Sequence, residues 1–320
     1  MLLSICIATR NQKDRLKLLL RSIETQITDD IEVVVLDESD DRGVELGSHS
    51  LPINMPVQYH HRESIFGIDG ALLSLLRMAK GKYVWLFGDD ILNPEALSLV
   101  TSFISKHNDL AVILVNSEEE GDPNLKTFGA TQSKIFKHPD EILIYDIGLL
   151  GFISAVILRR DLALVTLDTA EDYIGSSFIS LCVTLEVLGA GGQIGIIGES
   201  CFSSQAKPPG EQRWYNQAEV FGINLFVICK RHSHGFSKVA LDKALHRNMV
   251  RVLKAVIFER AMGFKTGFAS RDFNKYRLIK LYWRSITFWA LFLVTLLPDF
   301  ALDLTYQFSK RIRRYFCESF

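Results

Sequence analysis

The amino-acid sequence predicts an α/β protein, with a mostly parallel β-sheet covered by helices on both faces and followed by a basic helical region. Over the first two thirds of the 320 residues, short apolar segments alternate with amphipathic segments of helical period. Several apolar segments end directly in polar or acidic clusters, as strands do when their carboxyl ends face a ligand crevice. A hydrophobic content of 48% excludes a disordered chain.

The N-terminal strand–helix–strand unit is the clearest of these patterns. Residues 2–8 form an apolar run that predicts a buried strand. Residues 14–27 carry leucine and isoleucine at the period of an amphipathic helix, and residues 31–36 form a second strand rich in β-branched residues. A strand–helix–strand unit predicts two parallel strands joined by a right-handed crossover. Since parallel strands end at the same edge of a sheet, we expect the polar residues 9–11 and 37–41 at one edge.

The same alternation continues along the chain. We expect further strands at residues 57–60, 83–87, 110–115, 153–158 and 193–197. We expect further helices at residues 69–79, from Pro94-Glu95 onward, and at residues 176–188. The polar, turn-rich composition of residues 118–124 and 198–215 predicts a solvated acidic loop and an irregular loop.

The strongest chemical signal is Gly88-Asp89-Asp90, directly after the apolar strand of residues 83–87. Two adjacent carboxylates at the end of a buried strand are costly unless a cation neutralises them. Mg²⁺ and Mn²⁺ bind such oxygen ligands together with a substrate's phosphates. The alternative is that Asp90 caps the helix that follows, and these residues alone favour neither interpretation.

Four segments, at residues 3–11, 33–41, 66–69 and 79–97, occur in the order expected of a known family. The last of them, AKGKYVWLFGDDILNPEAL, is similar to an A-x-G-x-Y-h-x-h-h-D-x-D-D-h-h-x-P region, where h is hydrophobic. On these segments the chain resembles the family 2 glycosyltransferases, which have the GT-A fold. The Gly-Asp-Asp form and the later Tyr173-Ile174-Gly175-Ser176-Ser177 resemble O-antigen sugar transferases of the abequosyltransferase type.

The resemblance implies transfer of a sugar from a nucleotide-diphosphate donor, with inversion at the anomeric carbon. The implied donor-binding residues are Thr9, Arg10, Asn11, Asp37, Glu38, Asp69 and Asp89. A divalent cation, Mg²⁺ or Mn²⁺, would be held by Asp89 and Asp90, although the first aspartate of the family's D-x-D has no counterpart at Phe87 or Gly88.

The resemblance also implies a base that deprotonates the acceptor hydroxyl group. Glu171-Asp172 matches the family's E-D position, with Asp172 the first choice and Glu171 the second. The alternative is that both residues only stabilise the N-terminus of the helix that follows.

Charge divides the chain into two parts. Residues 1–229 carry 18 Lys and Arg against 31 Asp and Glu, whereas residues 230–320 carry 18 against 6. The basic excess predicts contact with an anionic surface. No nucleic-acid-binding motif accompanies it, so we expect an anionic membrane surface and no nucleic acid as partner. The alternative is that the two parts neutralise each other.

Residues 285–298 form an uncharged apolar run that is shorter than the roughly 20 residues of a spanning helix. We expect an interfacial helix with Trp283 and Trp289 at headgroup depth, assisted by the basic residues 310–314. The alternative is a helix pair packed on the catalytic domain with a solvated basic face.

These expectations give a domain division and a location. Residues 1–216 would form the GT-A nucleotide-sugar-binding catalytic domain, and residues 217–320 a basic amphipathic membrane-associating region. The five widely spaced cysteines fit a reducing cytoplasm. We therefore expect a peripheral protein on the cytoplasmic face of the cell membrane, acting on a lipid-linked saccharide in O-antigen synthesis.

Two other functions remain open at this stage. A sugar nucleotidyltransferase shares the α/β core, but the glycine-rich G-x-G-x-R start of that family is replaced by Thr9-Arg10-Asn11-Gln12. A non-catalytic membrane- or anion-binding module would use only the basic C-terminal part.

Overall fold

The protein is described by a computed structural model that covers residues 1–40, 55–119, 122–126, 128–204, 216–232, 234–262 and 273–303. Two compact units can be distinguished in the chain. The first consists of Met1–Ala206 and Cys229–Leu241, and the second of Lys207–Ile228 and Asp242–Phe320.

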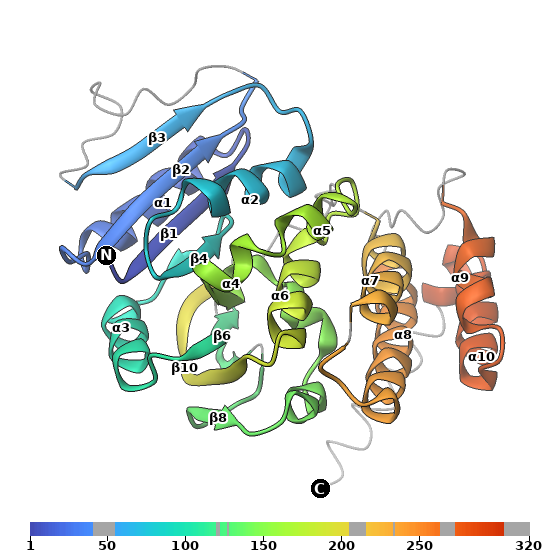
Figure 1. Cartoon of the computed structure of the whole chain (residues 1–320). Coiled ribbons are helices and arrows are strands. Elements are labelled where there is room, and N and C mark those ends of the chain that lie inside the picture. The colour runs from blue at the N-terminus through green and yellow to red at the C-terminus, as the bar shows by residue number, and fades with distance from the viewer. Residues whose placement is uncertain are drawn as a thin grey trace, which may run out of the picture. The chain divides into compact units, whose positions relative to one another are not determined.

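The first unit contains one large β-sheet with the strand order β3-β2-β1-β4-β9-β6-β10-β5 (Figure 1). Its strands are β1 (Leu3–Thr9), β2 (Ile31–Asp37), β3 (Val57–His61), β4 (Tyr83–Phe87), β5 (Ile91–Leu92), β6 (Leu110–Glu119), β9 (Val156–Arg159) and β10 (Gln193–Ser204). β3, β2, β1 and β4 run parallel, as do β6 and β10, whereas β9 is antiparallel to both neighbours. The predicted mostly parallel α/β sheet is confirmed.

The strand order reverses between β1 and β4. The chain leaves β1 through helix α1 (Lys13–Glu24) to β2 on one side, and later passes from β3 through helix α2 (Gly67–Met78) to β4 on the other side. Right-handed crossovers in opposite directions place α1 and α2 on opposite faces of the sheet. Ligands of such sheets bind outside the carboxyl ends of the strands at the point of reversal, here the ends of β1 and β4.

The central strands are almost continuously apolar because they are buried on all sides, as β4 shows. All five of its residues are buried, because β1 and β9 flank the strand and helices cover the sheet. The Trp85 and Phe87 rings pack edge to face with centroids 5.1 Å apart. The one polar atom of the Trp85 side chain donates a hydrogen bond of 2.8 Å to the Ser154 carbonyl oxygen. The rigid strand thereby fixes where the following Gly88-Asp89-Asp90 begins.

Several predicted boundaries differ from the structure. In the predicted acidic loop at 118–124, residues 118–119 instead end β6 and residues 122–124 begin the antiparallel strand β7 (Asp122–Lys126), while residues 120–121 lie outside the described ranges. β10 extends to Ser204, well into the predicted irregular segment, because it stays paired with β6 through register shifts. The remainder of that segment, residues 205–215, lies outside the described residues.

The other helices of the first unit lie beside the sheet. Helix α3 (Ala96–Lys106) contacts β10, and helix α6 (Ile179–Gly189) contacts β6. Short helices α4 (Arg160–Leu164) and α5 (Leu167–Glu171) also contact α6. A short strand, β8 (Lys134–Phe136), pairs with β10. α6 begins three residues later than predicted, which leaves residues 172–178 as a turn.

Helices form the C-terminal part of the described chain, as the sequence predicts. They are a π-helical segment (Ala218–Asn224), α7 (Leu225–Arg231), α8 (Lys238–Ala261), α9 (Lys275–Tyr282) and α10 (Ile286–Thr295). The second unit has its own hydrophobic cluster, which includes Val252, Leu278 and Phe288. None of the helices in the described ranges is both long and apolar enough to cross a membrane. The basic residues 310–314 lie outside those ranges.

Candidate functional site

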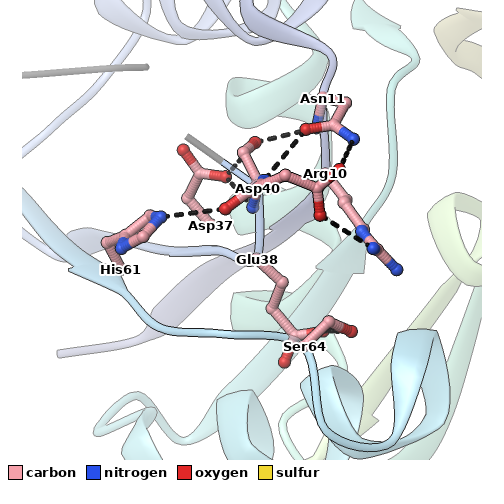
Figure 2. A network of polar contacts seen from close by, with 8 residues as sticks. Arg10, Asn11, Asp37, Glu38, Asp40, His61 and Ser64 are labelled. Carbon is pink, nitrogen blue, oxygen red and sulfur yellow. Dashed lines mark hydrogen bonds and ion pairs between the residues drawn. The ribbon is translucent and has the colours of Figure 1, made fainter. Parts of the chain in front are cut away.

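The carboxyl ends of β1 and β2 are joined by a polar network (Figure 2). The Asn11 backbone N–H donates to Ser39 Oγ at 2.7 Å, and the Asn11 side-chain amide donates to the Asp40 carboxylate at 2.7 Å. Arg10 forms an ion pair with Asp40 at 2.9 Å. Asn11 has a φ of 54°, a left-handed conformation that asparagine tolerates better than most residues. Arg10, Asn11 and Asp40 are exposed, so this network presents both charges and an amide to a ligand.

The hydrogen bonds from Asn11 and the ion pair with Arg10 lower the pKa of the Asp40 carboxyl below its ordinary value. The group is therefore ionised near neutral pH. Thr9, the remaining predicted contact on this loop, is only partly buried, and its carbonyl oxygen accepts from the Glu38 backbone N–H at 2.9 Å.

The predicted acidic residues Asp37 and Glu38 are buried rather than presented to solvent. Asp37 accepts hydrogen bonds from Ser39 Oγ at 2.5 Å and from Tyr59 Oη at 2.6 Å. Glu38 forms an ion pair with Arg62 at 2.8 Å and accepts from Ser64 Oγ at 2.8 Å. Both carboxylates are thus satisfied by the protein and hold the loop in shape, while Asp40, the next acid along the chain, is exposed.

At the carboxyl end of β4, Asp89 and Asp90 have different environments. The Asp89 side chain is 46% exposed and contacts the Arg15 guanidinium of α1. Asp90 is 8% exposed, and burial raises the pKa of its carboxyl to about 6 against a hydrogen bond from Ser154 that lowers it. The alternative role of Asp90 as a helix cap is wrong, because β5 follows it and α3 begins at Ala96 with Glu95 as its N-cap.

Asp89 and Asp90 fit a divalent cation whose remaining ligands are supplied by a substrate. The described residues contain no cluster of three or more His, Cys, Asp or Glu side chains arranged to hold a metal ion. Mg²⁺ is commonly bound by one or two carboxylates together with substrate phosphates, and a half-exposed Asp89 beside a buried Asp90 provides that donor set. In the structure the Arg15 guanidinium supplies the positive charge next to Asp89.

Asp69 lies in the first turn of α2 and is 2% exposed. Its carboxylate accepts hydrogen bonds from the backbone N–H groups of Gly175 at 2.9 Å, Ser177 at 2.7 Å and Ile179 at 3.3 Å. Burial raises the pKa of Asp69 above its ordinary value, and the backbone hydrogen bonds oppose that shift. Asp69 therefore fixes the turn before α6, and its carboxylate is turned toward the protein interior.

The same contact ties α2 to the turn that follows Glu171 and Asp172. α2 starts at Gly67, shortly after the carboxyl end of β3, so its first turn lies at the ligand-binding edge of the sheet. Asp69 brings the turn of Gly175 and Ser177 to the same edge, three residues after Asp172, whereas Glu171 lies beside the last turn of α2, which contains Arg77. Glu171 forms an ion pair with Arg77 at 2.5 Å, whereas Asp172 is exposed. Neither residue caps α6, since the first N–H group of this helix, that of Ile179, donates to Asp69 and the N-cap residue is Phe178.

The residue after Asp172 belongs to a buried polar chain. His232 Nδ1 lies 2.7 Å from Glu186 Oε1, and His232 Nε2 lies 2.6 Å from Tyr173 Oη. Because a carboxylate only accepts, Nδ1 carries a proton, and in the neutral ring Nε2 accepts from the tyrosine hydroxyl group. The chain ties the Tyr173 turn to α6 and to the segment that contains His232.

The comparisons with known proteins are consistent with this geometry. A family model described as glycosyl transferase family 2 matches residues 4–163, which is half of the chain. The chain belongs to glycosyl transferase family 2. Abequosyltransferase RfbV of Salmonella typhimurium (strain LT2) is 25% identical over 212 residues, covering 60% of this chain and 62% of that protein. The chain thus matches less than two thirds of that relative's length. The predicted resemblances, to the family 2 glycosyltransferases and to the abequosyltransferase type, are confirmed.

Solved structures of similar fold extend the match beyond the family region. S. aureus TarS has a TM-score of 0.61 at 18% identity, with 88% of this chain and 79% of that chain covered. A mannosyltransferase of Pyrobaculum calidifontis, PcManGT, has a TM-score of 0.51 at 14% identity, with 92% and 85% covered. At these identities the likeness shows the fold alone, and it confirms the predicted GT-A fold of this family 2 member.

Two further side chains contact the Gly88-Asp89-Asp90 segment of the candidate site and were not predicted from the sequence. Arg15 is the third residue of the helix that follows β1, at the carboxyl edge of the sheet, so its nearness to Asp89 had a signal in the sequence. Ser154 had none, because it lies in a 3₁₀ turn far along the chain and reaches Gly88 only through the tertiary fold, accepting its backbone N–H at 3.2 Å.

Proposed function

We propose that this family 2 protein transfers a sugar from a nucleotide-diphosphate donor to a hydroxyl group of a saccharide, with inversion at the anomeric carbon. The observation that carries the proposal is the half-exposed Asp89 at the end of β4, next to buried Asp90 and to Arg15, where the strand order reverses. The position is that of a ligand crevice.

Donor binding is assigned to the two loops at this edge. Arg10 and Asn11 can contact the donor's polar groups, whereas Asp37 and Glu38 hold the loop that carries Asp40. Asp69 contributes by fixing the turn before α6. In TarS and PcManGT, the corresponding structures are complexes with UDP-GlcNAc and with GDP-Man and Mn²⁺, which supports a nucleotide-sugar donor for this chain.

Asp89 and Asp90 would hold the divalent cation. When bound, Mg²⁺ or Mn²⁺ neutralises the charge that develops on the departing nucleoside diphosphate. The Arg15 guanidinium contacts the Asp89 carboxylate and adds a second positive charge to the site.

Asp172 is the proposed base. Its carboxylate is exposed, and among the described residues no ion pair engages it, whereas Glu171 is held by Arg77. Asp172 takes the proton of the acceptor hydroxyl group, and the resulting oxygen attacks the anomeric carbon from the face opposite the leaving group.

The acceptor and the location complete the proposal. The abequosyltransferase relative favours a saccharide of O-antigen synthesis, carried on a lipid, as acceptor. An enzyme with a lipid-linked acceptor must act at a membrane surface, so we propose that this protein is peripheral on the cytoplasmic face of the cell membrane. Residues 1–216 would supply the catalytic domain and residues 217–320 the membrane-associating region.

A panel of nucleotide sugars, each with Mn²⁺ or Mg²⁺, tests this proposal. We expect one donor to raise the melting temperature of the protein and to be hydrolysed slowly in the presence of the metal. Stabilisation by a nucleoside triphosphate and a sugar phosphate, with release of pyrophosphate, would favour the nucleotidyltransferase instead. If no nucleotide affects the protein, the proposed function is wrong.

A further inference from the structure

One side of α10 and of the residues after it carries exposed apolar side chains. Ile286, Trp289 and Leu293 lie at positions i, i+3 and i+7 of the helix, with exposed fractions of 87%, 38% and 58%. The stripe continues through exposed residues beyond the helix. We name the whole set the α10 apolar surface, and its members are Ile286, Trp289, Leu293, Leu296, Leu297 and Phe300.

The opposite side of α10 already forms the core of the second unit. Phe288 and Phe292 are buried in the hydrophobic cluster, with ring centroids 5.1 Å apart, and Thr295 is buried beside them. A helix on the surface of a water-soluble unit has polar residues on its outer face. α10 has apolar residues there as well, so the outer face is available to a partner and is not needed to complete the core.

We propose that the α10 apolar surface docks on a bilayer that contains anionic phospholipids, with α10 lying along the interface. The proposal rests on the membrane location proposed above and names the surface that makes the contact, and it is independent of the sugar donor. α10 has ten residues, or roughly 15 Å of helix, against a hydrocarbon core of about 30 Å. Its length therefore suits the interface and not a span.

The side chains around the stripe favour a lipid headgroup region. Trp289 Nε1 donates to the Trp283 carbonyl oxygen at 2.8 Å, and Trp283 is 55% exposed, so a second indole lies next to the one in the stripe. The Arg284 guanidinium lies 5.0 Å from the centroid of the Trp283 ring. Arg284, just before α10, and Lys280, in the last turn of α9, are both exposed. Their positions allow contact with anionic headgroups while the apolar residues enter the acyl boundary.

Charge also favours lipid over a second copy of this chain. The described ranges 216–228, 242–262 and 273–303 contain nine Lys and Arg against five Asp and Glu. In a symmetric dimer the same surface meets itself, so Lys280 and Arg284 would be brought toward their own copies. An anionic bilayer has the complementary charge instead.

Vesicle flotation of the full chain tests the proposal. We expect binding to vesicles of phosphatidylcholine mixed with phosphatidylglycerol, and weaker binding as salt is raised. The double variant Ile286→Glu/Leu293→Glu should lower the partition coefficient at least about tenfold. In the double variant Lys280→Gln/Arg284→Gln, the ratio of the partition coefficients measured with and without phosphatidylglycerol should fall several-fold. The matched control is Val165→Glu, which changes an 80% exposed valine of the first unit and should bind like wild type.

Three outcomes would overturn the proposal: no flotation of the wild type, undiminished flotation of the Ile286→Glu/Leu293→Glu variant, or a dimer in light scattering that this variant abolishes without vesicle binding. The last result would assign the surface to contact between copies. The stabilisation by nucleoside diphosphate and Mn²⁺ is measured on the same variants and should be unchanged. A failed docking surface is thereby distinguishable from a failed sugar-transfer proposal.

Discussion

The carboxylate of Asp69 accepts a 2.7 Å hydrogen bond from the backbone N–H of Ser177, a residue 108 positions further along the chain. Ser177 has a φ of 58°, a strained conformation for a residue with a Cβ atom. Asp69 thus holds a strained turn next to the candidate base. Because Asp69→Ala leaves the buried N–H group of Ile179 and the partly buried N–H group of Ser177 without an acceptor, we expect a loss of roughly 3 kcal/mol in the free energy of unfolding.

Thermal unfolding checks this expectation. Asp69→Asn keeps one acceptor oxygen and should lie between Asp69→Ala and wild type. Ser177→Gly is the matched control, because it retains the N–H and relieves the strain, and it should stabilise by up to about 1 kcal/mol. An Asp69→Ala variant as stable as wild type would show that the turn does not depend on this carboxylate.

Tyr173→Phe should destabilise the protein by about 1–2 kcal/mol. The variant keeps the ring contact with His232, whose centroid lies 5.0 Å away, but removes the hydroxyl group that bonds Nε2 in a buried site. The melting temperature of Tyr173→Phe is compared with that of Tyr276→Phe, which changes a 70% exposed tyrosine. Equal melting temperatures would contradict the structural role of the Tyr173–His232 contact.

Arg15→Gln should strengthen the binding of Mn²⁺ in the absence of donor. Arg15 contacts Asp89, so its positive charge opposes a cation at that carboxylate. We expect the dissociation constant to fall on the order of fivefold, measured by electron paramagnetic resonance of free Mn²⁺. Arg21→Gln, from the last turn of the same helix, is the control. Unchanged or weaker binding in Arg15→Gln would mean that Arg15 does not compete with the metal.

Asp90→Asn should stabilise the metal-free protein in a pH-dependent manner. Burial raises the folded-state pKa of Asp90 from 3.8 to about 6. The stability contributed by such a group is fully present below pH 4 and is lost as the pH rises through 6. Since asparagine does not ionise, the variant should match wild type near pH 4 and exceed it at pH 7.5 by at most about 3 kcal/mol. A difference that is constant with pH would contradict the raised pKa.

The sheet and the location of the site follow from local patterns. β1, β2 and β4 are continuous apolar runs because helices cover both faces, so their ends could be predicted within a residue or two. The rule that ligands meet the carboxyl ends of parallel strands then selects Arg10, Asn11 and Asp89 without further information.

What could not be predicted depends on contacts between distant residues. The composition of the acidic stretch that begins at Glu118 is that of a solvated loop. In the structure, however, Glu118 pairs with Lys126 of β7 and with β10, so strand pairing overrides local composition. The roles within the acidic groups were equally invisible. Asp69 binds backbone groups more than 100 positions away, and Glu171 rather than Asp172 meets Arg77.

Replacement of Asp89 tests the central claim most directly, namely that this carboxylate binds a cation shared with the donor diphosphate. We predict that Asp89→Asn loses the stabilisation by nucleoside diphosphate with Mn²⁺ and slows sugar transfer by at least about 100-fold. Asp14→Asn changes a side chain that is 96% exposed on α1 and should retain both properties. Sugar transfer by Asp89→Asn at the wild-type rate, with the Mn²⁺ response intact, would contradict the account.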